Sequence, residues 1–374
     1  MSIVFLRASH VSPDPRIEKE VRSLIKRYPN ITILAWDRDG GLARSEVLDF
    51  DLGNANIIRS AIRGRHGRGI KNIVALFRFQ FFLVFQIWKL RHEVEVIHAA
   101  DLSTAATGFF CSRILRIPLV YDIFDYYVDG YPVPKALKPL VEWLDIRIIN
   151  RANAVIIATE ARVDQIRPAL PRSLLVIHNT PDLAPIVPDA NLANSNRLVY
   201  VGILSEHRLL VELLGLFSRR PDLELHIGGF GPLEAMVKEF AQNFRNIIYY
   251  GRISYIETLA LESTALALFA VYDPSIANHA YSAPNKFYEA LSLGKPVIVA
   301  RGTGVDRLVE SFAVGIVVDY DANSFEQAVD DLLRDPVGAK AMGDHGRVVF
   351  RDEFDWPRME SRLHSLYATL IETE

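Results

Sequence analysis

Short runs of β-branched and aliphatic residues alternate along the chain with longer segments whose apolar positions recur at helical spacing. Residues 15–27 show the helical pattern between the first two runs. In the first half of the chain the apolar runs cover residues 3–6, 31–36, 94–98, 119–122 and 155–158. This alternation is typical of βαβ units around a parallel sheet. The sequence therefore predicts an α/β fold.

A segment rich in proline and asparagine interrupts the alternation. Residues 181–197 read PDLAPIVPDANLANSNR and show no periodic apolar pattern, which indicates an interdomain linker. Apolar runs resume afterwards at residues 198–201, 223–227, 247–250, 265–269, 296–300 and 315–318. We therefore expect two doubly wound domains, over residues 1–182 and 198–355, joined by a linker over 183–197. Ligands of such sheets bind at the carboxyl ends of the strands, so the cleft between the domains is the expected active site.

Composition and charge narrow the functional classes. Lys plus Arg number 42 against 45 for Asp plus Glu, a formal net charge of −3, which disfavours a nucleic-acid binder that acts through bulk positive charge. Cys111 is the one cysteine, so no intramolecular disulfide and no cysteine-based zinc site can form. The N-terminus lacks the basic start and apolar stretch of a signal peptide. We expect a cytoplasmic protein.

A basic and apolar segment departs from the globular pattern. Residues 59–91 contain no Asp or Glu, and their apolar core reads IVALFRFQFFLVFQIW. The apolar run over 73–88 is shorter than the roughly 20 residues that span a bilayer. It can lie in the plane of an anionic membrane surface, or it can be a buried domain helix beside a solvated basic loop. The basic residues are Arg59, Arg63, Arg65, Arg68, Lys71, Arg78, Lys89 and Arg91.

The most informative stretch is AYSAPNKFYEALSLGKPVIVA, residues 280–300. Pro284 suits a helix start and Gly294 a helix end, which predicts a loop, a short helix, a tight turn and a buried strand. Lys286 and Glu289 then share one helix face. A phosphate there would meet free N–H groups, the helix dipole and an ammonium together, and Glu289 could accept hydrogen bonds from a ribose diol. For Glu289 alone, stabilisation of the helix N-terminal turn is the competing interpretation.

Polar residues also follow the predicted strands of the first domain. His98 and Asp101 close one strand in VIHAAD, and Asp122 and Asp125 close the next, so all four are expected at the carboxyl edge of the sheet. Asp125 could orient or deprotonate an acceptor hydroxyl, or cap a helix. His98 is a candidate for catalysis or for a structural hydrogen bond.

Two loops complete the candidate chemistry. In SPDPR, Asp14 and Arg16 lie where the first strand-to-helix turn approaches a ligand, but no G-x-G-x-x-G occurs there. GGFG, residues 228–231, permits a close backbone approach to a nucleotide or forms only a tight turn.

The stretch PNKFYEALSLGKPVIV, followed by TGVDRLVESFAVGIVVD, resembles the donor-site signature of family 4 glycosyltransferases, in its Pro-Asn-Lys variant. These are retaining enzymes of the GT-B fold, with two facing Rossmann-like domains. A weaker resemblance extends over nearly the whole chain through RASHVSPDPRIEKEVRSL, VIHAADLSTAATG, LVYDIFDYY, VIHNTPDL, VYVGILSEHRLLVELL and LHIGGFGPLEAMV. It implies an acceptor-binding first domain, a donor-binding second domain, and a final helix over 356–374 that crosses back to the first.

The resemblance also implies site residues. The family has two glutamates eight positions apart; the second matches Glu289, whereas Tyr281 stands at the first. Ile203 replaces an arginine of the family pattern, which leaves Arg208 as the later basic match. His98 resembles the active-site histidine. The catalytic candidates are His98, Asp125, Arg208 and Lys286; the donor-binding candidates are Gly202, Arg208, Gly229, Gly231, Tyr281, Asn285, Lys286 and Glu289; and the acceptor-side candidates are Asp14, Arg16, Asp101 and Asp122.

Breaking a sugar–diphosphate bond leaves negative charge, which preorganised cations and N–H dipoles can stabilise without a metal. No DxD follows a strand, so we expect no metal and no cofactor beyond the nucleotide-sugar co-substrate. The sequence predicts a retaining hexosyltransferase-type enzyme with a glycan or lipid-linked acceptor, acting in cell-envelope polysaccharide or glycoconjugate synthesis. A non-catalytic sugar-nucleotide-binding subunit and a GT-B-like sugar-nucleotide epimerase are the alternatives.

Overall fold

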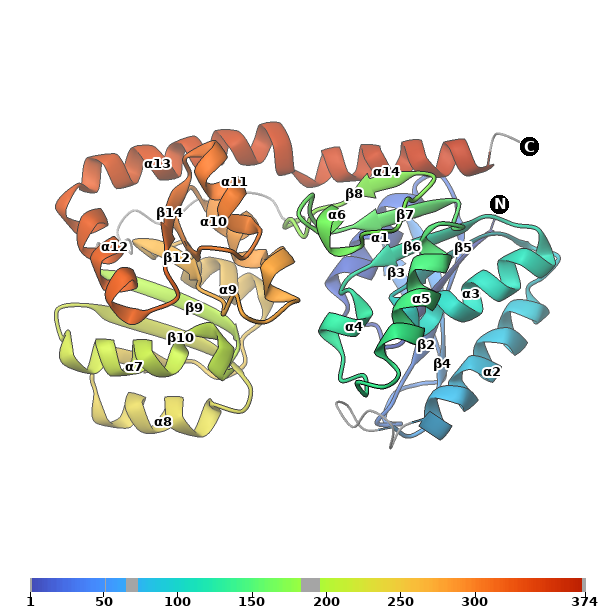
Figure 1. Cartoon of the computed structure of the whole chain (residues 1–374), viewed down its shortest axis with the longest axis horizontal. Coiled ribbons are helices and arrows are strands. Elements are labelled where there is room, and N and C mark those ends of the chain that lie inside the picture. Colours follow the sequence, from blue (N-terminus) through green and yellow to red (C-terminus); the bar gives the residue numbers. More distant parts are fainter. Residues whose placement is uncertain (1, 51, 65–72, 183–195, 372–374) are drawn as a thin grey trace. The chain divides into compact units, whose positions relative to one another are not determined.

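The structure is a computed structural model that describes residues 2–50, 52–64, 73–182 and 196–371. The chain divides into two compact units, residues 1–178 with 357–374, and residues 179–356 (Figure 1). Each unit is built around its own sheet with helices on both faces. The predicted α/β fold with two doubly wound domains is therefore confirmed. Residues 183–195 of the predicted linker lie outside the described residues.

An eight-stranded sheet forms the centre of the first unit, in the order β3-β4-β2-β1-β5-β6-β7-β8. All neighbours pair in parallel except β3 and β4, which are antiparallel. The carboxyl ends of β1, β5, β6 and β7 therefore share one edge. The strands are β1 (Ser2–Arg7), β2 (Asn30–Trp36), β3 (Ser45–Phe50), β4 (Gly53–Ser60), β5 (Val94–Ala100), β6 (Leu119–Ile123), β7 (Ala154–Ile157) and β8 (Leu174–Val176).

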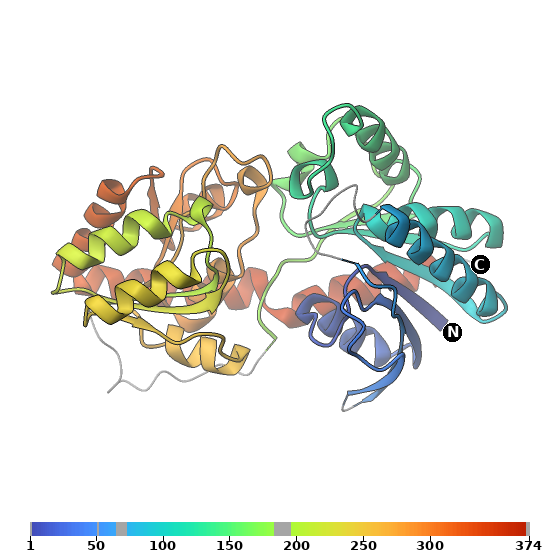
Figure 2. The same cartoon turned by 90° about the horizontal axis from the view of Figure 1, so that it is seen from below.

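Two groups of helices cover this sheet. Helices α2 (Ile73–Lys89), α3 (Leu102–Leu115) and α5 (Lys138–Ile149) lie side by side on one face (Figure 1). Helices α1 (Pro15–Ile25) and α14 (Trp356–Ile371) lie together on the other face, where Lys26 Nζ is 2.6 Å from Glu360 Oε1 (Figure 2). Two short helices, α4 (Tyr127–Gly130) and α6 (Arg162–Gln165), lie in connections after β6 and β7.

A six-stranded, all-parallel sheet forms the centre of the second unit, in the order β11-β10-β9-β12-β13-β14. One core lies against α7, α8 and α12, and a second lies against α9 and α10 on the other face. The strands are β9 (Arg197–Ile203), β10 (Glu224–Phe230), β11 (Ile247–Tyr249), β12 (Ala267–Ala270), β13 (Val297–Ala300) and β14 (Gly315–Val318). The helices are α7 (Leu210–Arg219), α8 (Glu234–Asn243), α9 (Tyr255–Glu262), α10 (Asn285–Leu293), α11 (Val305–Phe312), α12 (Ala322–Arg334) and α13 (Pro336–Val349), with short turns η2 (Glu206–Arg208), η3 (His279–Tyr281) and η4 (Phe350–Phe354).

The helix predicted inside residues 280–300 is present as α10, and the strand β13 follows it. Gly294 ends the helix with a φ of +66°, a left-handed conformation that favours glycine. A Cβ at this position would also come within 2.6 Å of Arg347 Nη2. The left-handed backbone therefore favours glycine here, and a larger residue would also have to displace the Arg347 guanidinium.

The segment 59–91 differs in part from the expectation. Arg59 is a buried residue of β4, not part of an exposed basic patch: its guanidinium donates to the carbonyls of His10, Val11 and Ala43 and pairs with Glu46. Residues 65–72 lie outside the described residues. Among the parts of the chain that the structure describes, no helix is both long and apolar enough to cross a membrane.

Candidate functional site

Two cations meet around one tyrosine at the carboxyl end of β9. The Lys286 ammonium lies 4.6 Å from the centre of the Tyr200 ring and donates to the carbonyl of Val201. The Arg208 guanidinium, from the turn after β9, lies 4.4 Å from the centre of the Tyr272 ring, and Tyr200 is a close electrostatic neighbour. Within the described residues, neither cation forms an ion pair with a carboxylate. The structure thus brings together two predicted donor-site residues that are 78 positions apart in the sequence.

Lys286 carries a positive charge in this environment. Burial lowers the pKa of Lys286, but Tyr200, Tyr272, Glu289 and Glu262 raise it, and the net shift is upward from its ordinary value. Its place in the first turn of α10 adds backbone N–H groups and the positive end of the helix dipole. The region therefore combines the features that bind a phosphate group.

The predicted glycines lie at the same sheet edge. A Cβ on Gly202 would lie 3.1 Å from Lys286 Nζ, so this glycine leaves room for the lysine. Gly229, with a φ of +121°, lies so close to β9 that a Cβ would collide with the Gly202 carbonyl oxygen. Gly231, with a φ of +149°, lies close to Leu204, where a Cβ would come within 2.5 Å of the carbonyl oxygen. The sequence GGFG therefore permits close approach between β9 and β10 at the strand ends.

Glu289 is buried rather than exposed at this edge. The Tyr255 hydroxyl and Glu262, both on α9, are close electrostatic neighbours of its carboxylate. Glu262 has no exposed surface, and neither of its carboxylate oxygens has a hydrogen-bond partner. Burial, and then the charge of Glu289, raise the pKa of Glu262 well above its usual range. Burial and the neighbouring carboxylate therefore both favour the protonated form of Glu262.

The remaining predicted donor residues lie in and after the η3 turn. Tyr281 is a half-buried residue of η3, four positions before the start of α10. Asn285 is the exposed first residue of α10.

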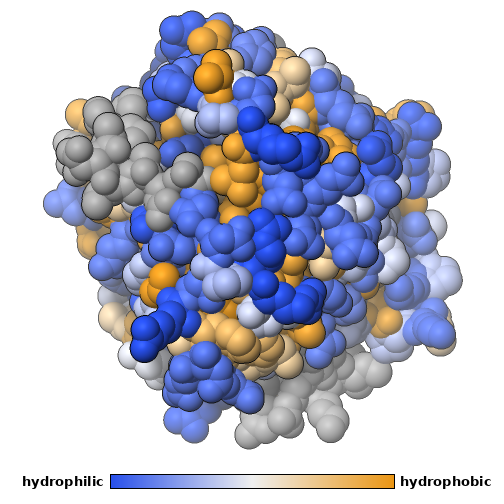
Figure 3. All heavy atoms as spheres, turned by 90° about the vertical axis from the view of Figure 1, so that its left-hand side faces the viewer, coloured by the Kyte–Doolittle hydropathy of each residue, from blue (hydrophilic) through white to orange (hydrophobic). Residues whose placement is uncertain are grey.

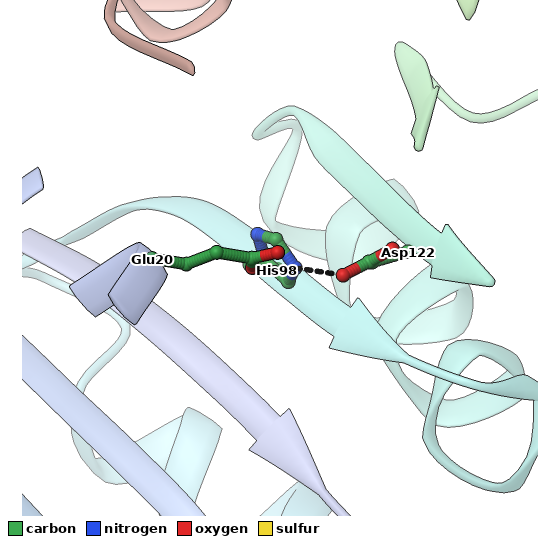
Figure 4. A group of neighbouring side chains, drawn as sticks. All are labelled: Glu20, His98 and Asp122. Carbon is green, nitrogen blue, oxygen red and sulfur yellow. Dashed lines mark ion pairs between the residues drawn. The ribbon is translucent and has the colours of Figure 1, made fainter. Parts of the chain in front are cut away.

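In the first unit, a buried network joins α1, β5 and β6 (Figure 4). His98 lies between the carboxylates of Glu20 and Asp122, with its Nε2 3.5 Å from Glu20 Oε2 and 3.7 Å from Asp122 Oδ2 (Figure 4). Arg16 lies 2.9 Å from Asp122 Oδ1 and 3.3 Å from Glu20 Oε1. The Tyr367 hydroxyl of α14 is 2.7 Å from His98 Nδ1. The network therefore ties the C-terminal helix to the centre of the sheet.

The expected place of His98 at the end of its strand is wrong. His98 lies two residues before the end of β5 and has no exposed surface, because its ring stacks on Phe5 at 4.3 Å and is covered by Tyr367. The strand continues to Ala100, and alternation along it turns His98 toward α1 and α14. In this conformation the histidine contacts other buried side chains and does not face solvent.

Protonation in this network follows from burial and charge. Burial raises the pKa of Asp122, but Arg16 and His98 outweigh it and hold that pKa at about 2. Burial and the nearby Asp122 raise the pKa of Glu20 well above its ordinary value. Burial lowers the pKa of His98. A charged Arg16–Asp122 pair therefore lies beside a Glu20 carboxyl and a His98 imidazole whose uncharged forms are favoured by burial.

Glu20, His98 and Asp122 are close enough together to hold a metal ion, since one ligand atom from each lies within 4.8 Å of the others. However, Arg16 already contacts both carboxylates and supplies the positive charge that a metal would bring. A divalent cation there would also face the guanidinium at short range. The arrangement fits an internal ion pair better than a metal centre.

The other acceptor-side candidates lie at the carboxyl edge of the first sheet. Asp14 caps α1 and accepts from Arg7 at 2.8 Å, while Arg7 also donates to Asp101 at 2.7 Å. Asp101 accepts in addition from the backbone N–H groups of residues 124 and 125, and burial, opposed by Arg7, raises its pKa to about 6. Asp101 has a φ of +62°, a strained conformation that is frequent at functional sites.

Asp125 differs from these residues because its side chain is 44% exposed. It lies 3.1 Å from Arg162, which is itself buried. A partly exposed carboxylate held by a fixed cation can orient a hydroxyl group. Of the four carboxylates predicted at this edge, Asp125 is thus the one with most access to solvent.

Several residues of both sites were not predicted, because they belong to no motif in the sequence. Arg7 lies 4.0 Å above the Phe124 ring, and Tyr127 and Tyr131 stack at 4.7 Å nearby in the chain. In the second unit the tyrosines around the cations and Glu262 were also missed. The one available signal was the (i, i+4) spacing of Arg16 and Glu20, which places them on one face of a helix.

Two family models match the chain: "Glycosyl transferase 4-like domain" over residues 15–180 and "Glycosyl transferases group 1" over residues 195–335. The two matches fall in the first and second units, respectively. Together with the two doubly wound sheets, they define a glycosyltransferase of the GT-B class. The chain belongs to glycosyltransferase family 4.

Individual proteins agree with this assignment. The chain is 30% identical, over 40% of each chain, to the GDP-mannose-dependent monoacylated alpha-(1-6)-phosphatidylinositol monomannoside mannosyltransferase of Corynebacterium glutamicum. It is 23% identical to the alpha-maltose-1-phosphate synthase of Mycolicibacterium smegmatis, over 73% of this chain and 78% of that protein. The solved structure of sucrose-phosphate synthase from Thermosynechococcus elongatus covers the full length of both chains with a TM-score of 0.81 at 17% identity, which shows the shared fold.

Proposed function

We propose that this chain is a retaining, hexosyltransferase-type enzyme that transfers a sugar from a nucleotide-diphosphate sugar to a glycan or lipid-linked acceptor in cell-envelope polysaccharide or glycoconjugate synthesis. One observation carries the proposal: Lys286 and Arg208 meet around Tyr200 at a sheet edge and, among the described residues, have no carboxylate ion pair. Cations held by aromatic rings and a carbonyl remain available for a diphosphate.

The proposed chemistry requires charge stabilisation at the leaving group. As the sugar–phosphate bond breaks, negative charge grows on the diphosphate, and Lys286, Arg208 and the N-terminus of α10 stabilise it. The departing phosphate then accepts the proton of the acceptor hydroxyl on the same face of the sugar, so the anomeric configuration is retained. Glu289 binds the ribose, and Asp125 orients the acceptor hydroxyl.

A thermal-shift panel of UDP, GDP, ADP and dTDP tests the donor site, because a nucleotide that binds the folded state raises the melting temperature. We expect one nucleotide to raise it in the wild type and to raise it much less in Glu289→Gln. Glu239→Gln, an exposed glutamate on α8, is the matched control and should respond like the wild type. Transfer is then measured with the corresponding sugar nucleotide. Binding without transfer or hydrolysis would instead support the non-catalytic sugar-binding subunit.

Metal independence is part of the proposal. The two cations and the helix N-terminus together supply the charge that a bridging metal would supply. Turnover should therefore persist in excess EDTA. Loss of turnover with EDTA, restored by Mg²⁺ or Mn²⁺, would contradict this mechanism.

We also propose that the enzyme is cytoplasmic and docks on an anionic membrane surface through α2. One stripe of this helix is exposed and apolar, with Phe77, Phe81 and Phe85 at its centre, while Lys89 and Arg91 lie at its C-terminal end. An interfacial helix with aromatic and basic residues gains from both acyl-chain contact and anionic headgroups. Docking would bring a lipid-linked acceptor to the enzyme.

A further inference from the structure

The exposed apolar surface of the first unit extends beyond α2. Helices α2, α3 and α5 lie side by side (Figure 1). Each presents large apolar side chains to solvent. We call this set the apolar platform: Val74, Phe77, Phe81, Phe85 and Trp88 of α2, Phe110 and Ile114 of α3, and Leu140 and Trp143 of α5. Extended exposed apolar surfaces of this kind mark interaction sites.

The pattern of α2 shows that this exposure is a property of the sequence. Its buried stripe, Phe79, Leu83 and Ile87, enters the core of the first unit. Its opposite stripe is apolar too, and Phe81 in the middle of it is 73% exposed. A helix with apolar stripes on two opposite sides is normally covered on both of them. By contrast, the face of the second unit that Figure 3 shows is mostly hydrophilic, with scattered apolar groups.

Cations lie directly on the aromatic rings of this surface. Lys89 lies 4.4 Å above Phe85, and Arg91 lies 5.1 Å above Trp88. Arg147 lies 5.4 Å above Trp143 on α5. Basic groups beside aromatic groups favour an anionic lipid surface over a neutral apolar partner.

A pocket opens at the C-terminal end of α5, beside the platform. Its volume is about 340 Å³, and among the described residues none of its three arginines pairs with a carboxylate. A fourth, Arg113 of α3, donates to the carbonyl of Arg151 at 2.6 Å and so lies beside the pocket. The lining residues are Trp143, Ile146, Arg147, Asn150, Arg151 and Arg172.

We propose that this arginine pocket binds the phosphodiester of an anionic lipid headgroup while the apolar platform enters the bilayer interface. Three guanidinium groups without counter-ions match a phosphate, which arginine binds through paired N–H donors. Leu170, whose N–H donates to Asn150 Oδ1, is 82% exposed at the pocket, and Trp143 is part of both pocket and platform. A free phosphate would leave these apolar groups in water, whereas a lipid would cover them. The inference rests on the proposed function, which supplies a reason for membrane contact.

Vesicle co-sedimentation of the full chain tests the pocket. Wild type should bind vesicles of phosphatidylcholine with phosphatidylglycerol and bind phosphatidylcholine alone only weakly. The triple variant Arg147→Ala, Arg151→Ala, Arg172→Ala should lose roughly tenfold or more in binding, since each basic residue contributes several-fold near an anionic surface. The control is a triple variant with the same charge change at exposed arginines outside the pocket and platform: Arg44→Ala, Arg219→Ala and Arg245→Ala. It should bind like the wild type.

Two outcomes would overturn the inference directly: the wild type stays in the supernatant, or the control triple variant loses as much binding as the pocket triple variant. A third would be a triple variant with lysine at the three pocket arginines that binds as well as the wild type. In that case only the positive charge would matter, not the guanidinium groups. Release of the wild type by inorganic phosphate at constant ionic strength would assign the pocket to free phosphate instead. Nucleotide-induced thermal stabilisation, measured on every variant, shows that each is folded. It also separates this inference from the proposed function, which fails if no nucleotide binds or if a bound sugar nucleotide is not transferred.

Discussion

Lys286 and Arg208 are held by partners that a ligand can replace. A tyrosine ring and a backbone carbonyl stabilise a cation less than a carboxylate does. A diphosphate that replaces them therefore gains a charge–charge interaction and loses only these weaker contacts. A carboxylate partner would have had to be displaced first. The absence of one among the described residues therefore favours an anion-binding role over a structural one.

We predict that Lys286→Ala and Arg208→Ala each lower kcat by roughly 100-fold, with a smaller rise in the donor KM, because leaving-group charge is greatest in the transition state. Steady-state kinetics with the identified sugar nucleotide measures both parameters. Lys238→Ala, which removes an exposed ion-paired lysine on α8, should leave them unchanged. A rise in KM at constant kcat would assign these cations to ground-state binding alone.

The buried Glu262 predicts a pH dependence of stability. Because its folded pKa is raised above the unfolded value, its contribution to stability is complete below the unfolded pKa of about 4.5 and decreases as pH rises toward the folded pKa. Glu262→Gln keeps the shape and cannot ionise. Melting curves between pH 5 and 9 should therefore show that the melting temperature of the variant rises relative to that of the wild type as the pH increases. Parallel curves for the two proteins would contradict the raised pKa.

At the scale of elements, α14 is fixed to the first unit by a polar contact inside an apolar interface. The Tyr367 hydroxyl bonds His98 in a region without solvent, and Arg362 donates to the Val176 carbonyl at 2.9 Å. A buried hydrogen bond contributes more when its loss leaves a partner unsatisfied. The C-terminal helix therefore depends on a histidine at the centre of the sheet.

We predict that Tyr367→Phe destabilises the first unit by about 1–2 kcal/mol, because His98 Nδ1 loses its partner in the interior. Urea unfolding followed by tryptophan fluorescence reports mainly on this unit, since it contains Trp36, Trp88 and Trp143. Tyr250→Phe removes a similar hydroxyl–histidine bond, to His226, at a partly exposed site and should cost less than 0.5 kcal/mol. Equal losses in both variants would mean that burial does not strengthen the bond.

Regular elements were largely predictable from the sequence, and edge elements were not. Every short apolar run predicted as a strand is a strand, because a central parallel strand buries both faces and reads as a continuous apolar run. Strands β3, β4 and β8 were missed: β3 alternates exposed and half-buried residues, and β8 has only three residues. In β4, Arg59 resembled surface charge because its partners lie 13 to 49 positions away.

The sites follow the same rule. Lys286, Gly202 and Arg208 were found because a local motif or a strand end marks each of them. Tyr200 and Glu262 were missed because their roles depend on contacts across the unit that no spacing reveals. His98 was misplaced for a related reason. The predicted strand ended at residue 98, two residues before the end of β5. Helix α14, which covers the histidine, is more than 250 residues later in the chain.

At the scale of the whole molecule, the chain passes between the two units twice, at residues 178–179 and at 356–357. The first unit is therefore discontinuous in sequence, and its last helix is placed only after the second unit has been made. Because two connections join the units, one unit can rotate relative to the other only in ways that both connections permit. A hinge about these crossings is the movement that the connectivity permits.

We predict that donor binding closes the two units on one another, because a nucleotide sugar held by the second unit must meet an acceptor held by the first, and closure excludes water from the reaction. Small-angle scattering should show a smaller radius of gyration with the nucleotide that stabilises the protein. Glu289→Gln at the same nucleotide concentration should show a smaller change, and a nucleotide that gives no thermal shift should show none. Identical scattering with and without the stabilising nucleotide would mean that the donor binds without closure, and the acceptor would then have to reach a site that is already assembled.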